Sequence, residues 1–483
     1  MLALLALAMT VCLGLAYAVP YHGNHSGEIE QEGWIWSIVL TLAGASLFFL
    51  TGLWKSRKRA HERTLRRREA MALVGLGWVV GGVTVSLPFM LCGPSVSFEN
   101  ALFEGVSGLT TTGATIFVEI ESLPRSILLW RSLTQWVGGM GILAMFVVVL
   151  SGVSANHKAL IGAESSLSNT DISTLKRTMR KLWLLYLCFT VICGLGLVAM
   201  GLTPFEALNH ALTAASTGGF GTENTSVGGD PFGTGSKLWL VLFMLLGALS
   251  FPFYLAVLER KPLRVLRERF EEIFWFLGIV VFACLLLFLQ KWRGGLEEDG
   301  VDILFNVVSI VTSTGYVSSD YTTWGGVGVV VLLALMVVGG CSGSTSGGLK
   351  VSRMILWFRF VRTNLRRTFR PQAVLQVRLN GRSVPEGTQE GLFLVFSFYA
   401  FFAIFGTLLF LLLEPGHTLF GAISVIVSCL GNTGPALAEM HAADAFVRTG
   451  VGTKMLFVTY MILGRLEYVA LLVLFTRQLW KRY

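Results

Sequence analysis

Charge is scarce in this sequence. Asp, Glu, Lys and Arg make up 14% of the 483 residues, whereas a soluble protein carries roughly 25%. The 7 histidines are scattered, the 7 cysteines lie mostly within or at the ends of apolar segments, and neither set has the spacing of metal ligands. A nucleophile motif is also missing. These absences argue against a soluble domain and against a membrane enzyme, and they predict buried, reduced cysteines.

The sequence does contain many long apolar runs. Hydrophobic residues make up 53% of the chain, and its many runs of about 18 or more apolar residues are typical of transmembrane helices. The basic residues behind the net charge of +9 alternate with these runs. Such alternation orients a membrane protein, with its basic loops in the cytoplasm. It argues against nucleic acid as a partner and leaves membrane lipid as the surroundings.

One dipeptide, Thr-Gly, recurs in matching surroundings as Thr112-Gly113, Thr217-Gly218, Thr314-Gly315 and Thr433-Gly434. Each copy ends a moderately hydrophobic stretch that is too short to cross a bilayer, and a long apolar segment lies on either side. We expect half-helices at 97–112, 204–217, 301–314 and 418–432. The repeating unit is therefore a long helix, a half-helix, a Thr-Gly turn and a second long helix.

The apolar segments predict ten membrane-crossing helices in an all-α polytopic protein. Two leading spans, 1–20 and about 34–54, precede the four units. The paired spans are expected at 71–92 and 126–153, 182–202 and 237–258, 272–290 and from about 325, and 391–413 and 453–475. The basic run 55–68 and a long loop from about 359 to 390 then fall in the cytoplasm. Every Thr-Gly turn falls on the outer side.

This order predicts five parts of the chain. They are 1–70 (two N-terminal transmembrane helices and a basic loop), 71–154 (first repeat), 155–260 (second repeat), 261–370 (third repeat, with a broken second helix) and 371–483 (fourth repeat). Residues 1–20 allow two interpretations. Ala16-Tyr17-Ala18 is typical of a signal-peptide cleavage site, but the basic segment that begins a signal peptide is missing, so a retained helix is favoured.

Turns of this kind suit an alkali cation. Non-helical backbone at membrane depth is tolerated only where protein buries it or where it lines a watery path. A half-helix that stops at Thr-Gly leaves its last carbonyl groups unpaired, and the negative end of its dipole lies at the same place. Four turns around one axis would offer rings of oxygen atoms that replace the hydration shell of the ion.

With these motifs in hand, the sequence resembles the Trk/Ktr/HKT superfamily of potassium transporters, and specifically the TrkH type. The resemblance is carried by Thr110–Thr115, Ala215–Thr222, Thr312–Tyr316 and Gly431–Pro435 and covers essentially the whole chain. It implies four tandem M1–P–M2 repeats, like those of potassium channels, around one pore, with two extra N-terminal helices. It also implies a homodimer and a cytosolic ring of TrkA-type nucleotide-binding (RCK/KTN) domains that gates the pore.

The resemblance implies potassium uptake across the plasma membrane, the bacterial inner membrane, with the filter mouth outside. Potassium is the bound ion, and no other cofactor is expected on this chain. The implied filter residues are Thr111, Thr112, Gly113, Ser216, Thr217, Gly218, Ser313, Thr314, Gly315, Asn432, Thr433 and Gly434. Glycine in all four filter copies (Gly113, Gly218, Gly315 and Gly434) goes with potassium preference in this family.

A second element is the run Gly339–Gly348, which consists of glycine, serine, threonine and cysteine within the expected second helix of the third repeat. Such a run does not continue a helix easily, and it lacks the Gly-Lys-Ser/Thr ending of a phosphate-binding loop. It matches the intramembrane gating loop of TrkH-type proteins. The implied gating residues are Gly339, Gly340, Ser342, Gly343, Ser344, Thr345, Ser346, Gly347, Gly348 and, in the last span, Arg465.

Arg465 is a functional candidate because a charge within a membrane span is costly. Residues two apart do not share a helix face, so Glu467 is a poor direct partner for it. Among the acids, Glu206 and Asp302 fall near half-helix starts, where they favour the helix dipole. Glu104 lies deeper in its half-helix and receives no role.

One alternative function stays open from the residues alone, a secondary transporter in which sodium or protons drive cation uptake. Such folds also use broken helices. They usually contain inverted repeats and intramembrane acids, whereas these four units all run in one direction. An ion-conducting uptake protein is therefore the preferred reading.

Overall fold

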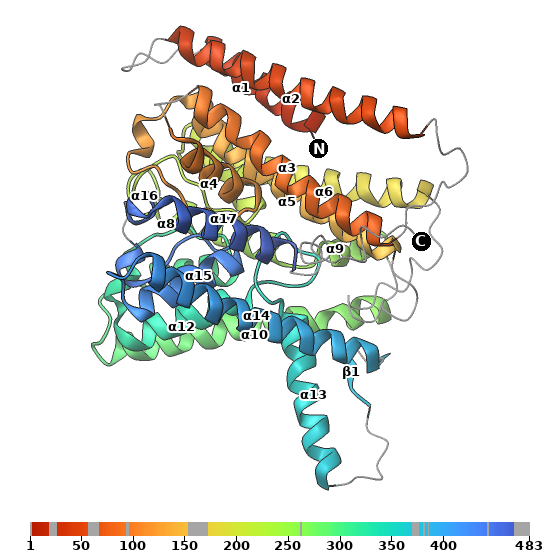
Figure 1. Cartoon of the computed structure of the whole chain (residues 1–483). Helices are drawn as coiled ribbons and strands as arrows, with labels where there is room; N and C mark the ends of the chain where they lie inside the picture. Colours follow the sequence, from red (N-terminus) through yellow and green to blue (C-terminus); the bar gives the residue numbers. More distant parts are fainter. Residues whose placement is uncertain are drawn as a thin grey trace.

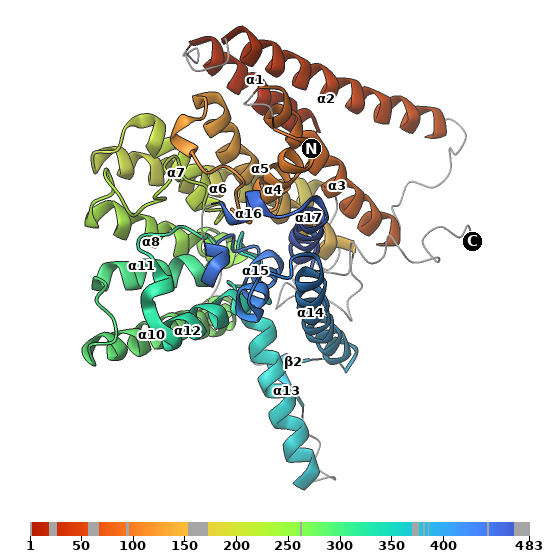
Figure 2. The ribbon, with the colours of Figure 1, turned by 60° about the vertical axis from the view of Figure 1, so that its left-hand side comes forward.

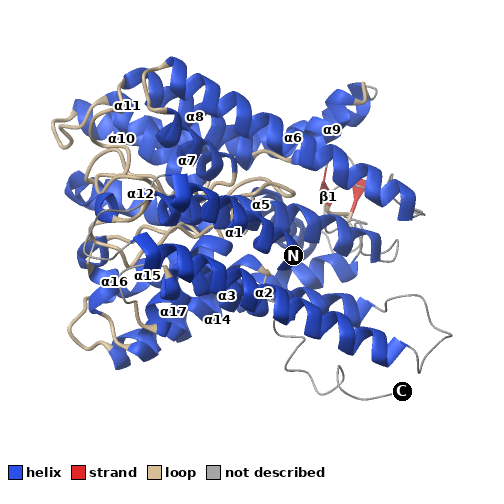
Figure 3. Cartoon of the chain, turned by 90° about the horizontal axis from the view of Figure 1, so that it is seen from above, coloured by secondary structure: helices blue, strands red, loops and turns tan. Residues whose placement is uncertain are grey.

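The computed structural model describes residues 2–18, 27–56, 67–92, 96–152, 172–260, 263–369, 376–379, 382–384, 386–441 and 444–467. Almost all of the regular structure in these ranges is α-helix, as predicted. Most of the long helices run roughly side by side in one bundle (Figures 1 and 3). The seven cysteines are free thiols, and Cys188 is exposed while the others are buried.

The long helices overlap the predicted spans. They are α1 (Leu2–Ala18), α2 (Gly27–Ser56), α3 (Arg67–Leu91), α5 (Arg125–Gly152), α6 (Ile172–Ala199), α8 (Thr234–Ala248) with α9 (Phe251–Leu258), α10 (Leu263–Trp292), α12 (Gly325–Val338), α13 (Val351–Phe369), α14 (Glu386–Leu413) and α17 (Val451–Arg465). Of these, α2, α6 and α10 start well before the predicted residues 34, 182 and 272. Within the described ranges, five helical segments are long and apolar enough to cross a membrane, or six if the bent pair α8–α9 counts as one span.

Short helices lie at the four predicted half-helix positions. They are α4 (Phe98–Leu109), α7 (Pro204–Ala215), α11 (Gly300–Val311) and α15 (Leu419–Gly431). A helix of 12 residues rises about 18 Å, well short of the roughly 30 Å of a hydrocarbon core. Two of the starts are capped by threonine. Thr203 forms a capping box with Glu206, and Thr418 accepts a hydrogen bond from the backbone N–H of Gly421.

The packing of these short helices closes into a ring. Each packs against the long helices of its own unit and also against the outgoing long helix of the preceding unit: α7 on α5, α11 on α8, α15 on α12, and α4 on α17. The last pair joins the end of the chain to its beginning. The C-terminal ends of the four short helices are therefore held by contacts that run once around the molecule.

The second helix of the second unit differs from its prediction. A single span over 237–258 was expected, but α8 ends at Ala248, α9 starts at Phe251, and their axes differ by 89°. Pro252 stands in the first turn of α9, where its missing N–H costs nothing. The break is therefore compatible with local sequence, and its cause lies in the segment that packs into it, described below.

The predicted loop from about 359 to 390 was also wrong in part, because α13 continues as a helix to Phe369. This helix leaves the bundle at a steep angle (Figures 1 and 2). In the described part of the chain the strands are two short ones, β1 (Arg378–Leu379) and β2 (Arg382–Ser383), which pair antiparallel. At the other end, α17 stops at Arg465, and most of the predicted extension to 475 lies outside the described residues.

The crossing of α5 over the C-terminal end of α4 depends on glycine. A Cβ atom on Gly138 would overlap the backbone carbonyl of Leu109, whereas one on Gly141 would first meet the Trp78 ring at 3.6 Å, an ordinary contact. We predict that Gly138→Ala destabilises the protein by about 1–3 kcal/mol, as overpacking does, and that Gly141→Ala is nearly neutral. The melting temperatures of the two purified variants in detergent check this. Equal melting temperatures would contradict the close crossing.

Candidate cation site

The four half-helices end in turns of one shared shape. The second residue of each turn has a left-handed backbone: Thr111, Thr217, Ser313 and Asn432 have φ values of 53°, 53°, 53° and 51°. Two residues later comes a glycine that is also left-handed. These glycines are Gly113, Gly219, Gly315 and Gly434, with φ of 87°, 79°, 83° and 96°. A left-handed backbone strains residues with a side chain but not glycine.

Hydrogen bonds give the same register. The N–H groups of Thr112, Gly218, Thr314 and Thr433 each donate to a carbonyl five residues earlier, at 2.8–3.0 Å. Gly218 therefore occupies the place of Thr112, and Gly219 is the counterpart of Gly113. Predicting Gly218 as that counterpart was wrong by one residue, because Thr217-Gly218-Gly219 contains two adjacent glycines and the Thr-Gly dipeptide marks the first.

The four left-handed glycines hold the turns against one another. A Cβ on Gly113 would overlap the carbonyl oxygen of Gly218, and one on Gly219 would overlap that of Thr314. In the same way Gly315 abuts the carbonyl of Thr433, and Gly434 abuts that of Thr112. Each turn thus meets the next and the fourth meets the first. Each of these four positions requires glycine for two reasons: the backbone is left-handed, and a side chain would overlap the neighbouring carbonyl group.

The carbonyl oxygens at this ring differ in their partners. Within the described residues, no hydrogen-bond donor reaches the carbonyl oxygens of Thr112, Thr314 or Thr433. The carbonyl of Gly218 accepts a hydrogen bond from Nε2 of Gln135 at 2.7 Å. Unpaired carbonyl oxygens gathered around one point are the ligands that a dehydrated alkali cation requires. A group of three His, Cys, Asp or Glu side chains able to hold another metal is not found in the described ranges.

The fourth turn is joined to the first by a side chain. Nδ2 of Asn432 donates to Oγ1 of Thr112 at 3.0 Å and to the carbonyl of Met461 at 2.8 Å. Asn432 tolerates the left-handed backbone better than most residues because of its short polar side chain. Buried hydroxyls of Thr111 and Thr433 have no partner among the described residues. All twelve predicted filter residues therefore lie on the four turns, and the turns lie together.

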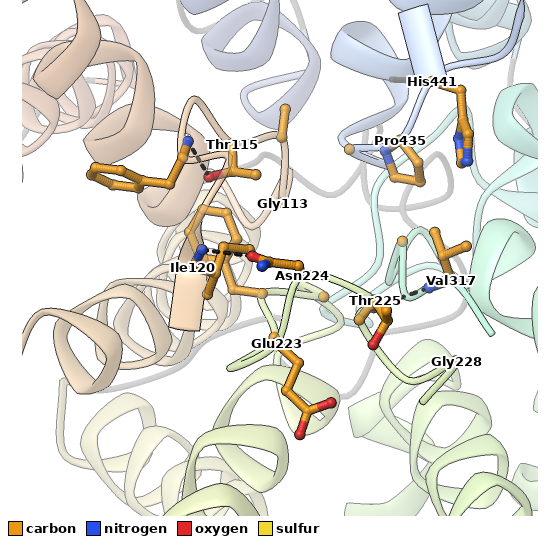
Figure 4. Close-up of a pocket in the computed structure, with 18 of the residues that line it drawn as sticks. Gly113, Thr115, Ile120, Glu223, Asn224, Thr225, Gly228, Val317, Pro435 and His441 are labelled. Carbon is orange, nitrogen blue, oxygen red and sulfur yellow. Dashed lines mark hydrogen bonds between the residues drawn. The ribbon is translucent and has the colours of Figure 1, made fainter. Parts of the chain in front are cut away.

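A cavity of about 530 Å³ opens on one side of the ring. Figure 4 shows Gly113, Asn224, Val317 and Pro435, one from each unit, around it. Glu223 and Asp320 also line this cavity. Burial, together with the nearby acids Glu206, Glu121 and Asp230, raises the pKa of Glu223. This shared negative charge favours cations at the mouth.

The run Gly339–Gly348 lies between α12 and α13 and is not helical. It fills the break between α8 and α9. The N–H of Cys341 donates to the carbonyl of Ala248 at 2.9 Å, and the N–H of Phe251 donates to the carbonyl of Gly343 at 3.0 Å. The helix break and the loop therefore satisfy each other's backbone groups, which explains why α8 can end inside the bundle.

The same loop contacts the turns of the second and third units. Oγ1 of Thr345 accepts from Oγ1 of Thr217 at 3.2 Å, and the N–H of Gly347 donates to Oγ of Ser313 at 2.6 Å. A small cavity of about 40 Å³ lies between the loop, Asn432 and Arg465, room for one or two water molecules. The ring is thus open on one side and nearly closed on the other.

Arg465 is buried at the C-terminal end of α17, and most of the rest of the predicted span, to 475, lies outside the described residues. Its Nη1 donates to the carbonyl of Thr345 at 2.8 Å, so the arginine and the loop are in direct contact. Its Nε and Nη2 have no acceptor among the described residues. Glu467 instead pairs with Arg353, which agrees with the expectation that it is a poor partner for Arg465.

The other acids take distinct places. Glu206 caps α7, as expected, while Asp302 in the first turn of α11 also pairs with Lys237 at 2.8 Å. Glu104 pairs with Arg131. Neither Arg131 nor Gln135 was selected from the sequence as a functional residue. Arg131 was visible as a lone charge in the apolar span 126–153. Its partner was not, because the two residues lie on different helices.

Comparisons with known proteins agree with this fold. A family model described as TrkH, "Cation transport protein", matches residues 37–292 and 298–482. The Trk system potassium uptake protein TrkH of Salmonella typhimurium is 33% identical over 436 residues, 89% of each chain. TrkI of Halomonas elongata is 33% identical over 92% of this chain and 89% of its own. The crystal structure of the potassium transporter TrkH from Vibrio parahaemolyticus superposes with a TM-score of 0.85, 29% identity and coverage of 99% and 98%.

The corrected register gives a prediction about ion binding. A cation that binds the folded protein raises its melting temperature, so we expect potassium to stabilise the wild type more than sodium does. Gly219→Ala should abolish this difference, because its Cβ would overlap the carbonyl of Thr314. Gly218→Ala should keep part of it, since there the Cβ meets the Gln135 side chain, which can move. Melting curves in each salt test this, and a greater loss in Gly218→Ala would contradict the register.

Proposed function

This chain belongs to the TrkH family of cation transport proteins, and from that premise we propose that it takes up potassium through a channel-like pore. Its potassium uptake relatives cover most of its length. The observation that carries the proposal is the ring in which four glycines abut four carbonyl groups and the fourth turn meets the first. One chain thereby supplies an arrangement that would otherwise need four subunits.

The proposed selectivity filter consists of the twelve predicted residues with Gly219 added. Carbonyl oxygens of Thr112, Gly218, Thr314 and Thr433 would replace water around potassium, and the larger cavity would admit the hydrated ion. The four turns differ in sequence and in hydrogen bonding, as the Gln135 contact to Gly218 illustrates. We therefore expect a preference for potassium over sodium that is real but less sharp than in a filter of four identical turns.

We assign gating to the loop Gly339–Gly348 and to Arg465. The loop lies directly against the turns. Arg465 contacts the loop and lines the small cavity, and two of its buried N–H groups have no acceptor among the described residues. A positive charge at low dielectric repels a resting cation strongly. Opening would then require two movements. The loop would withdraw from Thr217 and Ser313, and Arg465 would release the carbonyl of Thr345.

The remaining proposals concern assembly and place. We infer a homodimer in the bacterial inner membrane, with the large cavity outside, and a cytosolic TrkA-type nucleotide-binding ring that moves the loop. Five or six membrane-crossing candidates among the described residues support a multi-pass protein. The basic stretches 55–68 and 350–382 would lie in the cytoplasm, where they are available to the ring. Potassium is the transported ion, and we propose no other cofactor on this chain.

Growth rescue tests the function. In a bacterial strain without potassium uptake systems, we expect this chain to restore growth at limiting potassium, more strongly with a TrkA-type partner. Gly113→Ser should remove the rescue, because a side chain there would strain the backbone and overlap the carbonyl of Gly218. Failure of the wild type under both conditions, with protein in the membrane, would favour a coupled transporter with another substrate.

A further inference from the structure

A buried ion pair lies beside the first two turns. Glu104 of α4 and Arg131 of α5 have side chains 0% and 1% exposed, and Oε1 lies 2.9 Å from Nε. Two charges are costly to remove from water, and such a pair is retained only where its geometry satisfies both groups. The contacts of this pair show what it joins.

Glu104 holds the chain that follows the first turn. Its carboxylate accepts hydrogen bonds from Oγ1 of Thr115 and from the N–H of Ile116, each at 3.0 Å. Arg131 reaches further. Its Nη2 donates to Oγ1 of Thr115 at 3.2 Å, and its Nη1 donates to the carbonyl of Gly221 in the second unit at 3.0 Å. The guanidinium also lies 4.2 Å from the centre of the Phe220 ring.

The equivalent contacts of the other units carry no charge. In every unit a side chain of the half-helix holds the backbone or a hydroxyl about twelve residues further on. The pairs are Glu104–Ile116 at 3.0 Å, His210–Thr222 at 3.3 Å, Asn306–Ser318 at 3.1 Å and Ser424–Leu437 at 3.0 Å. In the described chain, the first unit alone uses a carboxylate here, and it alone has an arginine that continues to the next turn.

From this arrangement we propose that Arg131 and Glu104 are positioning residues that set the distance between the first and second turns and so the preference for potassium over sodium. The inference rests on the proposed uptake function and deepens it. A planar guanidinium with donors on two edges fixes two acceptors relative to each other, which an ammonium group cannot do. Arg131 bridges the outer chain of both turns in this way.

Glu104 has a second consequence for the ion. Arg131 reaches the wall of the 530 Å³ cavity, so its charge would oppose an arriving cation if it were not balanced. The carboxylate at 2.9 Å supplies that balance. Loss of the Glu104 carboxylate alone therefore weakens ion entry. Replacing the Arg131 guanidinium by a group without its two donor edges loosens the spacing between the first and second turns. The two roles separate in experiment.

The test measures uptake of potassium and sodium by cells that express each full-length variant, together with its amount in the membrane. Arg131→Lys keeps the positive charge but loses the planar guanidinium with its two donor edges. We expect its potassium-to-sodium uptake ratio to fall about tenfold, the size of effect expected for a charge-assisted hydrogen bond. Glu104→Gln should also raise the potassium KM about tenfold. The double variant Glu104→Gln with Arg131→Gln should recover KM but keep the low ratio.

Asp302→Asn is the matched control. It also removes a carboxylate from a half-helix and breaks an ion pair, with Lys237, but it lies at the helix start, away from the turns, and should keep the wild-type ratio. If Arg131→Lys keeps that ratio too, the inference is wrong. If Glu104→Gln does not accumulate, Arg131→Lys decides alone. Absence of potassium uptake by the wild type would instead reject the proposed function.

Discussion

Hydrocarbon cannot hydrogen-bond to a backbone carbonyl, and the architecture of this protein depends on that constraint. Half-helices that end inside the bundle would leave their last carbonyl groups unpaired in lipid. The chain brings four such ends together, so that each turn is covered by the next, and the last returns to the first through Gly434 and Asn432. Unpaired carbonyl groups would destabilise a single half-helix in lipid, but the four ends together form a ring of oxygen atoms.

The same constraint explains the break between α8 and α9. The backbone groups freed there are taken up by the loop at Cys341 and Gly343, which in turn contacts Thr217. Break, loop and turn are therefore one hydrogen-bonded unit. A loop that moved would expose carbonyl groups on both sides, so its movement needs water or an ion to replace the lost donors. If the loop gates the proposed pore, its movement would therefore be coupled to hydration beneath the turns.

Much of the framework was predictable from sequence, because hydrophobic length and the recurring dipeptide are local signals. The half-helix starts and ends agree within a few residues. The errors have a common source in contacts between distant segments. The break after Ala248 depends on a loop about 90 residues later, Gly219 rather than Gly218 depends on how the turns meet, and the partner of Arg131 lies on another helix. Arg465 was found because a buried charge is a local anomaly, although its helix ends sooner than expected.

We propose that ions pass through the ring along their own gradient, without coupling to a second ion. Rubidium uptake into liposomes that contain the purified protein tests this, with an outward potassium gradient as the driving force and with sodium and proton concentrations equal on both sides. We expect rubidium to accumulate under these conditions. Accumulation that appears only when a sodium or proton gradient is imposed would contradict it and establish a coupled transporter.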